Sequence, residues 1–304
     1  MMTFKEHFRT NFNIRLQIAD SGTELAELHQ SKLLKDFKAE TNIFKFNQIE
    51  IKADPFLFVH NDTLYLFYEE KKRKSNGYIM MTSTKDLKKW TTPTLVLQES
   101  YHLSFPFVFM QGDEFYLLPE TGEAGEIRLY RFCDDTLTNV EFVKTLQKGQ
   151  FVDSSIIYKD GKNYLFTSDS LFNQRVFVSE NLLGDYIEHR SSPIYVGRDY
   201  GRNAGSIFEY GGRYYRPSQD CSHLYGGNVT IHQFIDLDTN SIKETNYLKD
   251  IFSKDNPYYL YGGHQLNMVE FRNNIIIATD ALDLNFNIFK IIQKVLYKVF
   301  HINV

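Results

Sequence analysis

The chain has 304 residues and a formal net charge of −4, with 34 basic and 38 acidic residues interspersed along it. No basic stripe is present that could neutralise a nucleic-acid backbone, so we exclude nucleic acid as a partner. The aromatic residues, 20 Tyr and 26 Phe against one Trp, favour β-strands over helices.

Residues 1–46 are expected to supply a closing strand and a short helical lead. The segment GTELAELHQSKLLKDF, at 22–37, has apolar residues at helical spacing. The opening MMTFKEHFRTNF carries charges where a signal peptide needs apolar residues, and the two cysteines have no CxxC or metal-binding spacing. We therefore expect buried free thiols and a cytoplasmic protein.

Residues 47–282 repeat one pattern at intervals of about 50 residues: an apolar strand, a tight turn and an aromatic strand. Each unit is a β-hairpin, and further strand signals follow it. Four strands per repeat predict an all-β fold, a five-bladed β-propeller. A sandwich is the alternative, but it would not place the same hairpin at a fixed period. The expected blades are 47–97, 98–148, 149–196, 197–250 and 251–282.

The innermost strand of each blade lines the channel, so equivalent residues from all blades converge at its mouth. Asp54 and Asp153 occupy such positions within apolar strands, where a carboxylate is costly unless it is paired. We predict that both are catalytic; the alternative is that each ties down a neighbouring blade. The residues in register are Asp54, Phe105, Asp153, Ala204 and Gln265.

A second ring of acids follows at the end of the next strand of each blade. An acid there commonly caps a loop, which is the alternative interpretation for every member. Glu120, in the segment LLPET, is the member we predict to be catalytic. The ring comprises Glu69, Glu120, Asp169, Asp220 and Asp280.

The fourth and fifth repeats add cations and polar groups around the mouth. The planar guanidinium of arginine matches carboxylate or phosphate, whereas a lone Arg or His is commonly a solvated or structural residue. We predict that these residues bind substrate: Arg198, Arg202, Asn203, Arg216, Asp220, His223 and His264.

The repeats resemble the five-bladed propellers of glycoside hydrolase family 43, through the ADP opening at Ala53 and the later TSTKDLKKW. The resemblance implies a catalytic base at Asp54 and a pKa-modulating Asp at Asp153. Other segments are more similar to the N-terminal propeller domain of glucosamine inositolphosphorylceramide transferases, a domain that also occurs alone in bacterial polysaccharide-synthesis proteins. They are HLSFPFVF, LLPET, GRNAGSIFEYGGRYYRPSQDCSHLYG and GGHQLN.

One position departs from the hydrolase pattern. Family 43 enzymes place a general-acid Glu at the start of the fourth blade, where this chain has Asn203 and Ala204. A hydrolase needs that acid to protonate a sugar-alkoxide leaving group, whereas a phosphate leaves as a stable anion. We therefore expect a glycosyltransferase of cell-surface polysaccharide synthesis with a phosphate-activated sugar donor and a glycan acceptor. A hydrolase with a displaced acid and a non-catalytic glycan-binding module are the alternatives.

The last segment, 283–304, is predicted to form an amphipathic helix. Phe286, Phe289 and Ile292 follow helical spacing, and Lys290, Lys294 and Lys298 form a stripe. Such a helix suits peripheral contact with an anionic membrane through residues 285–300, at the inner face of the membrane; packing on the propeller or in a dimer is the alternative. The sequence has no metal-binding motif, and a divalent cation near His264 is left open.

Overall fold

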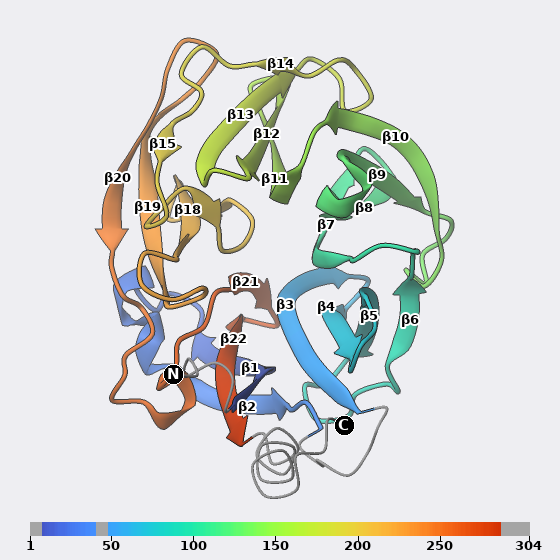
Figure 1. The fold of residues 1–304 in the computed structure, drawn as a ribbon, viewed down its shortest axis with the longest axis vertical. Helices are drawn as coiled ribbons and strands as arrows, with labels where there is room; N and C mark the ends of the chain where they lie inside the picture. Colours follow the sequence, from blue (N-terminus) through green and yellow to red (C-terminus); the bar gives the residue numbers. More distant parts are fainter. Residues whose placement is uncertain (1–7, 41–47, 287–304) are drawn as a thin grey trace, which may run out of the picture.

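The computed structural model describes residues 8–40 and 48–286. In this part of the chain the strands form five blades around a central axis, as Figure 1 shows, which confirms the predicted propeller. The helical elements described are short 3₁₀ turns, η2 (Leu25–Gln30), η3 (Gly122–Ala124) and η4 (Pro257–Tyr259).

The first three blades follow one another along the chain as antiparallel sheets. Blade 1 comprises β3 (Ile49–His60), β4 (Thr63–Lys72), β5 (Gly77–Thr84) and β6 (Thr94–Leu97). Blade 2 comprises β7 (Ser104–Gln111), β8 (Glu114–Glu120), β9 (Glu126–Phe132) and β10 (Val140–Lys148). Blade 3 comprises β11 (Phe151–Lys159), β12 (Lys162–Asp169), β13 (Asn173–Ser179), β14 (Ile187–Glu188) and β15 (Tyr195–Val196).

The last two blades are less regular. In blade 4 the innermost strand is split in two, β16 (Arg202–Asn203) and β17 (Phe208–Tyr210), and both parts pair with β18. Its other strands are β18 (Arg213–Asp220), β19 (Asn228–Leu237) and β20 (Ile242–Leu248). Blade 5 combines the two ends of the described chain: β21 (Leu266–Phe271), β22 (Asn274–Phe286), β1 (Phe8–Asp20) and β2 (Lys32–Phe37).

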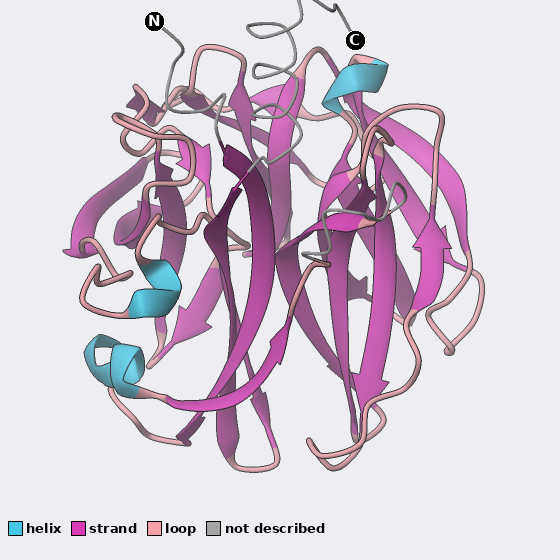
Figure 2. Ribbon diagram, turned by 60° about the horizontal axis from the view of Figure 1, so that its bottom comes forward, coloured by secondary structure: helices cyan, strands magenta, loops and turns pink. Residues whose placement is uncertain are grey.

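Blade 5 closes the ring. Strand β1 pairs with β22 along its whole length, from Phe8 opposite Phe286 to Asp20 opposite Asn274. Chain segments from opposite ends of the sequence therefore hold one blade together, and both leave the described region at the same end of the strands (Figure 2).

Two expectations for the chain ends need correction. In the predicted helical lead only Leu25–Gln30 is helical, as 3₁₀ turns, and Lys32–Phe37 is the edge strand β2, because pairing with β1 outweighs the helical spacing. Within the predicted C-terminal helix, residues 283–286 continue strand β22 through its pairing with β1. Residues 287–304, with the lysine stripe, lie outside the described residues.

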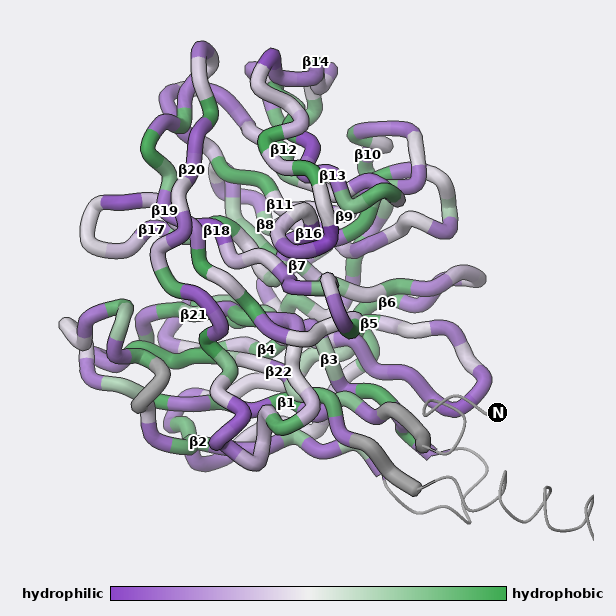
Figure 3. Tube along the Cα trace, turned by 60° about the vertical axis from the view of Figure 1, so that its left-hand side comes forward, coloured by the Kyte–Doolittle hydropathy of each residue, from purple (hydrophilic) through white to green (hydrophobic). Residues whose placement is uncertain are grey.

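The core consists of apolar and aromatic side chains packed within and between the blades. Phe56 of blade 1 meets Phe105 of blade 2 edge to face, with ring centroids 4.8 Å apart, and Phe166 of blade 3 meets Phe234 of blade 4 in the same way. Figure 3 shows hydrophobic stretches along the strands and hydrophilic ones in many loops. Of the two free cysteines, Cys221 is buried as expected, whereas Cys133 is exposed.

A bulge recurs near the start of the innermost strand in the first three blades. Asp54, Phe105 and Asp153 have φ angles of 51°, 45° and 52°, in the left-handed region, and the strand register shifts at each. Such a bulge interrupts the pleat and redirects a side chain. Aspartate tolerates this conformation, which is uncommon for a residue such as phenylalanine. The bulges therefore place equivalent side chains at the channel mouth.

Candidate functional site

The predicted register at the channel mouth agrees with the strand pairing. In every blade the predicted mouth residue lies four residues before the residue that pairs with the aligned position on the next strand. Asp54, for example, lies four residues before Phe58, which pairs with Tyr65. Asp54, Asp153 and Gln265 are all at least nine-tenths buried. The structure gathers charged and polar groups from the blades into one buried cluster.

His264, at the start of blade 5, lies between two carboxylates. Its Nδ1 is 2.7 Å from Asp280 Oδ2, and its Nε2 is 3.7 Å from Asp54 Oδ1. The Asp280 carboxylate also accepts hydrogen bonds from the backbone N–H groups of Asp54, His264 and Gln265, at 2.9–3.1 Å. Asp280 therefore fixes both neighbours in place.

The same contacts set the protonation of this group. Burial opposes a charged imidazole, but Asp280 and Asp54 outweigh it and raise the pKa of His264 to about 9. Burial raises the pKa of Asp54 to about 6, against the charge of His264, which lowers it. At neutral pH the arrangement is an imidazolium between two carboxylates, and Asp54 can take up a proton close to neutrality.

A second ion-pair group joins blades 2, 3 and 4. Arg202 Nε and Nη2 donate to the two carboxylate oxygens of Asp153, and Nη2 lies 3.6 Å from Glu120 Oε2. These acids raise the pKa of Arg202 well above its ordinary value even though burial opposes its charge. The guanidinium is therefore neutralised within the protein by Asp153 and is only 16% exposed.

Two glutamates at this mouth favour the protonated form. Burial, with the charge of Asp153, raises the pKa of Glu120 well above its ordinary value. Burial, with the charge of Asp54, raises the pKa of Glu69 to about 8. Glu69 Oε1 lies 3.6 Å from His102 Nε2. Both carboxyl groups therefore hold a proton more readily than an exposed glutamate does, and Glu69 is mainly protonated at neutral pH.

The ring of acids at the strand ends needs correction in two blades. Glu69 and Glu120 each lie four residues after the aligned tyrosine of their blade. The same count from Tyr164 and Tyr215 gives Ser168 and Gln219, one position before Asp169 and Asp220. Asp169 accepts from the backbone N–H groups of Leu171 and Asn173, and Asp220 from that of Ser222. Both cap loops, so the alternative interpretation holds for them.

Buried amide side chains complete the cluster, and sequence reasoning missed Gln219. Its Nε2 donates to Asp153 Oδ2 at 3.1 Å and to the carbonyl of Asn203 at 2.7 Å. Asn203 Nδ2 donates to the carbonyl of Asp153 at 2.7 Å. Gln265 is fully buried, and neither of its amide atoms has a partner in the described protein. Gln219 lies four residues after the aligned Tyr215, as Glu69 lies four after Tyr65, so equal spacing in each blade would have identified it.

Tyr225, which sequence reasoning also missed, contacts both ion-pair groups. Its ring lies 5.1 Å from the guanidinium of Arg202 and 5.3 Å from the ring of His264. The other side of His264 stacks on Phe12 at 4.5 Å. Tyr225 is 39% exposed, so it forms the solvent-facing border of the cluster. It lies in the β18–β19 loop, which has no counterpart in the repeat pattern that could reveal it.

Besides Asp220, which caps its loop, three more of the predicted substrate-binding residues lie outside the cluster. Arg216 is fully buried and donates to Glu244 and to the carbonyl of Tyr200, which makes it part of the packing of blade 4. Arg198 is exposed; it covers the ring of Phe172 and donates to the carbonyl of Cys221. His223 is exposed in the loop that carries Tyr225.

Asp54, His264 and Asp280 could together hold a metal ion. Their ligand atoms lie within 4.8 Å of one another, and all three residues are buried. One imidazole and two carboxylates are a donor set that divalent transition metals accept. A metal needs the neutral imidazole, so it would have to displace the proton that the raised pKa of His264 retains.

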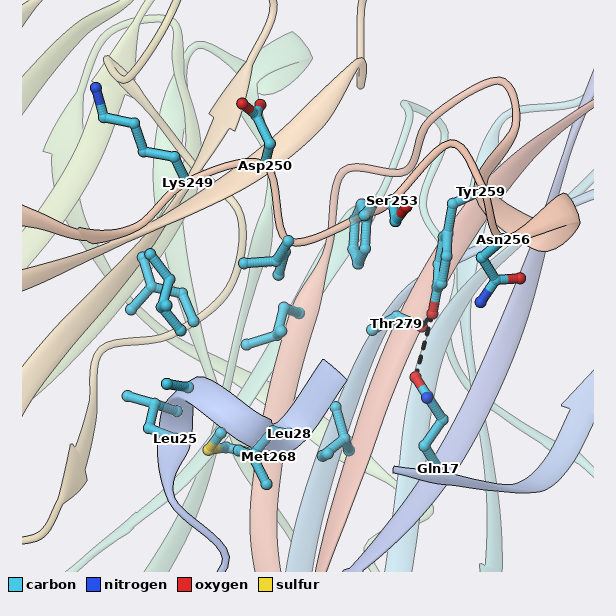
Figure 4. A pocket seen from close by; sticks show the side chains of 17 residues that line it. Gln17, Leu25, Leu28, Lys249, Asp250, Ser253, Asn256, Tyr259, Met268 and Thr279 are labelled. Atoms are coloured by element: carbon cyan, nitrogen blue, oxygen red, sulfur yellow. Dashed lines mark hydrogen bonds between the residues drawn. The ribbon is translucent and has the colours of Figure 1, made fainter. Parts of the chain in front are cut away.

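Two hollows lie near this cluster. One, of about 720 Å³, is bordered by charged, polar and apolar residues of the Asp220–Asn228 and Asp250–Tyr261 segments. The other, of about 380 Å³, lies between blades 4 and 5 and is mostly apolar (Figure 4). Among the described residues, no helix is long and apolar enough to cross a membrane.

Comparisons with known proteins agree with the resemblance found in the sequence. Residues 41–279 match the family model "Glucosamine inositolphosphorylceramide transferase 1, N-terminal". Proteins named glucosamine inositolphosphorylceramide transferase 1 from Oryza sativa subsp. japonica and Arabidopsis thaliana are 36% identical over 203 residues, which cover 63% of this chain. The match spans only 27% and 26% of those relatives, about a quarter of their length.

Solved structures with a similar fold include glycoside hydrolases. The α-L-arabinofuranosidase PaAbf62A from Podospora anserina has a TM-score of 0.57 at 12% identity, covering 79% of this chain and 93% of that one. The α-L-arabinofuranosidase CtGH43 from Clostridium thermocellum has a TM-score of 0.55 at 17% identity, covering 74% and 80%. At such low identity these likenesses establish the fold alone.

Proposed function

This chain belongs to the family of the glucosamine inositolphosphorylceramide transferase 1 N-terminal domain, and we propose that it transfers a sugar to a hydroxyl group of a glycan acceptor. The name of its relatives supports transfer rather than hydrolysis. More specifically, we propose that the product is a cell-surface polysaccharide and that the sugar donor is activated by a phosphate. The protein would work at the inner face of the membrane, which it would contact peripherally through residues 285–300.

The observation that carries the proposal is the buried base at Asp54. Its pKa of about 6 lies close to neutrality, where a general base is both deprotonated and basic enough to act. The Asp280 carboxylate accepts a hydrogen bond from the backbone N–H of Asp54. The Asp54 carboxylate in turn accepts one from the backbone N–H of Phe105 at 3.1 Å. A base with a fixed position is what proton removal from an acceptor hydroxyl requires.

The proposed reaction uses the residues of the mouth as follows. Asp54 takes the proton of the acceptor hydroxyl, and the oxygen of that hydroxyl forms a bond to the anomeric carbon of the donor. The bond from that carbon to the donor phosphate breaks, and its electron pair leaves with the phosphate. Burial raises the pKa of Glu120 well above its ordinary value, so that its protonated form can donate a hydrogen bond to a sugar oxygen, and the free amide of Gln265 contributes further polar contacts.

The donor phosphate needs a cation that is not already neutralised. Arg202 is paired with Asp153, and His264 lies between two acids, so neither offers a free positive charge. Arg198 is exposed and donates to the loop that carries Tyr225 and His223. We assign the phosphate to Arg198 and His223, beside the cluster rather than within it.

The test is the Asp54→Asn variant in a transfer assay with purified protein. Donors are first selected by a thermal-shift screen of sugar nucleotides, sugar phosphates and free oligosaccharides, since a ligand of the folded state raises the midpoint. We expect Asp54→Asn to bind the selected donor but to lose transfer by at least about 100-fold. Full transfer by this variant would contradict the proposal. Binding of oligosaccharides without turnover would indicate a binding module.

Glycoside hydrolysis is a second candidate function because the structure offers a proton donor at another place. Asn203 and Ala204 stand where the family 43 acid would be, but burial raises the pKa of Glu120 well above its ordinary value, which favours its protonated form. A protonated carboxylic acid can protonate a sugar-alkoxide leaving group. Hydrolysis of aryl glycosides by the protein, abolished in Glu120→Gln, would favour this function over transfer.

A further inference from the structure

The proposed base and its neighbours are closed off from solvent. Asp54, Asp153 and Gln265 are 5%, 2% and 0% exposed, although they lie at the mouth of the channel. Neither of the two hollows is lined by any of these three residues. In this conformation a sugar cannot reach the carboxylate of Asp54, so the mouth must open before a substrate meets it.

Several buried polar atoms at the mouth have no hydrogen-bond partner among the described residues. They are Glu69 Oε1, Glu120 Oε2 and both amide atoms of Gln265, and they come from blades 1, 2 and 5. A buried polar atom without a partner is unfavourable, and native proteins keep few of them. Carboxyl and amide groups together suit a ligand that both donates and accepts hydrogen bonds, as the hydroxyl groups of a sugar do.

Tyr225 covers these groups. Its ring lies 5.1 Å from the guanidinium of Arg202 and 5.3 Å from the ring of His264, so it contacts both ion-pair groups. Burial raises the pKa of its hydroxyl well above the ordinary value, and Asp153 acts in the same direction against the charge of Arg202. The hydroxyl thus lies close to the charged groups, while the residue as a whole is 39% exposed. Tyr225 therefore closes the mouth from the solvent side.

The loop that carries this ring is fixed at its two ends. It spans Cys221–Gly227, between strands β18 and β19. At its start, the N–H of Cys221 donates to the carbonyl of Arg198 at 2.7 Å, and Arg198 Nε donates to the carbonyl of Cys221 at 3.1 Å. At its end, the N–H of Gly227 donates to the carbonyl of Asp220 at 3.0 Å. Fixed ends on both sides of a short tip suit a hinged movement of the tip.

Gly226 allows the loop to lie against the site. Its φ angle is 67°, in the left-handed region, and a Cβ added to it would lie 3.1 Å from the Cβ of His264. A Cβ added to Gly262, on the facing segment, would lie 2.4 Å from the carbonyl oxygen of Gly226. Glycine tolerates both the conformation and the close approach. The closed position of the loop therefore depends on Gly226.

The hollow of about 720 Å³ lies on the other side of this loop. His223 and Leu224 line it from the loop, and Lys254 and Leu260 line it from the facing segment. Tyr225, whose ring contacts the cluster, does not line it. The loop thus separates the mouth from the hollow. A hollow of this volume is large enough for a small molecule, so it has room for the displaced tip of the loop.

We propose that Tyr225 is a gate over the channel mouth. The tip of the Cys221–Gly227 loop moves toward the hollow, and a sugar ring takes the position of the tyrosine ring beside Arg202 and His264. The hydroxyl groups of the sugar then pair with the carboxyl and amide atoms that lack partners in the closed mouth. The identification of the ligand as a sugar rests on the proposed function; the gate rests on the loop, its ring and the hollow.

The test measures how fast carboxyl groups of the full chain react with a water-soluble carbodiimide and glycine ethyl ester, with each labelled residue identified by mass spectrometry. Labelling of Asp54 and Glu69 reports opening of the mouth. Asp185, whose side chain is fully exposed, gives the rate of an accessible carboxyl, and the buried Glu244 reports global unfolding. We expect Asp54 and Glu69 to react far more slowly than Asp185 in the wild type. Equal rates would show that the mouth is already open and would overturn the proposal.

Tyr225→Ala removes the gate. Contacts of the ring with two cations favour the closed loop, so their loss should speed the labelling of Asp54 and Glu69 by at least about fivefold. Glu244 should stay unlabelled, which shows that the variant is folded. Tyr158→Ala, an exposed tyrosine of blade 3, is the control and should label like the wild type. Labelling of Asp54 and Glu69 that is no faster in Tyr225→Ala would overturn the gate.

Two further variants test the hinge and the hollow. Gly226→Ala places a Cβ against His264 and should also speed labelling, whereas Gly112→Ala, with a φ angle of 63° and open space around it, is the matched control and should not. Lys254 is exposed and lines the hollow, so Lys254→Trp should fill part of it and slow the labelling, whereas Lys254→Ala should not. An unchanged rate in Lys254→Trp would overturn the movement toward the hollow.

The position of the sugar is tested in the opened protein. An excess of mixed glucose, galactose, mannose and xylose should slow the labelling of Asp54 and Glu69 in Tyr225→Ala but not that of Asp185, and a lack of protection would overturn the placing of the sugar. None of these rates depends on catalysis. If transfer is never found but Tyr225→Ala opens the mouth, the proposed function fails and the gate stands. If transfer is found while Asp54 in the wild type reacts as fast as Asp185, the reverse holds.

Discussion

Arg202 of blade 4 forms a two-pronged ion pair with Asp153 of blade 3, across the joint between two blades that meet at the channel mouth. Glu120 of blade 2 lies 3.6 Å from the same guanidinium. The buried guanidinium of Arg202 therefore connects three blades. Because Asp153 neutralises its charge, it is not free to bind an anionic ligand. This pairing is why we place the donor phosphate outside the cluster.

The first prediction follows from this pairing. Arg202→Met leaves the carboxylate of Asp153 buried without its cation, and loss of one partner of such a pair costs about 3–5 kcal/mol in the free energy of unfolding. Urea denaturation measures that loss. Adding Asp153→Asn removes the unpaired charge, so the double variant should regain a large part of the stability. Equal stability of wild type and Arg202→Met would contradict the arrangement described.

Stability should also depend on pH through His264. Its folded-state pKa of about 9 lies above the ordinary value of 6.5, so the folded state holds the proton more tightly than the unfolded state does. The resulting stabilisation is complete below pH 6.5 and is lost as the pH rises through about 9. Glu69, whose pKa is raised to about 8, acts in the same direction.

We therefore expect the free energy of unfolding to fall between pH 6.5 and pH 9, as measured by urea denaturation across this range. His264→Gln, which cannot titrate, should flatten the part of the slope that belongs to the imidazole. A stability that rises with pH over this window would mean that His264 is neutral in the folded protein.

The repeat made the fold and much of the site predictable. A hairpin recurring at a fixed period predicts blades, and aligning the hairpins brought Asp54 and Asp153 to one place because their bulges fall at the same position. Gln265 joins them through the same spacing to its strand partner, without a bulge. Asp280 was identified in the second ring, but sequence alone could not reveal that its carboxylate holds the backbone of Asp54 and His264.

The remaining errors have local causes. Asp169 and Asp220 are acids at a strand end, but they lie five residues after the aligned Tyr164 and Tyr215. The spacing of four that leads to Glu69 and Glu120 leads instead to Ser168 and Gln219. Arg216 lies three residues before Gln219 on β18, so strand alternation turns it to the opposite face. Tyr225 lies in a loop, where no periodicity applies.

Arg216 gives a prediction that separates structure from binding. It is fully buried, and Glu244, 7% exposed, is its ion-pair partner. Arg216→Met should lower the free energy of unfolding by about 3–5 kcal/mol, with partial recovery on adding Glu244→Gln. Its affinity for any sugar ligand, measured by calorimetry well below the unfolding temperature, should equal that of the wild type. A selective loss of affinity with unchanged stability would restore Arg216 as a binding residue.

The last prediction concerns the rate of sugar transfer as a function of pH. If Asp54 is the base, activity should rise as the pH passes through about 6, where its carboxyl loses its proton. The charge of His264 lowers this pKa, and burial, Asp280 and Asp153 raise it. His264→Gln removes the lowering influence, so the acidic limb of the kcat/KM profile should move upward by about one unit or more. Because His264 acts through Asp54, transfer by His264→Gln should recover at higher pH, whereas transfer by Asp54→Asn should not recover at any pH. An acidic limb that stays in place in His264→Gln would mean that the ionisation controlling the rate belongs to another group.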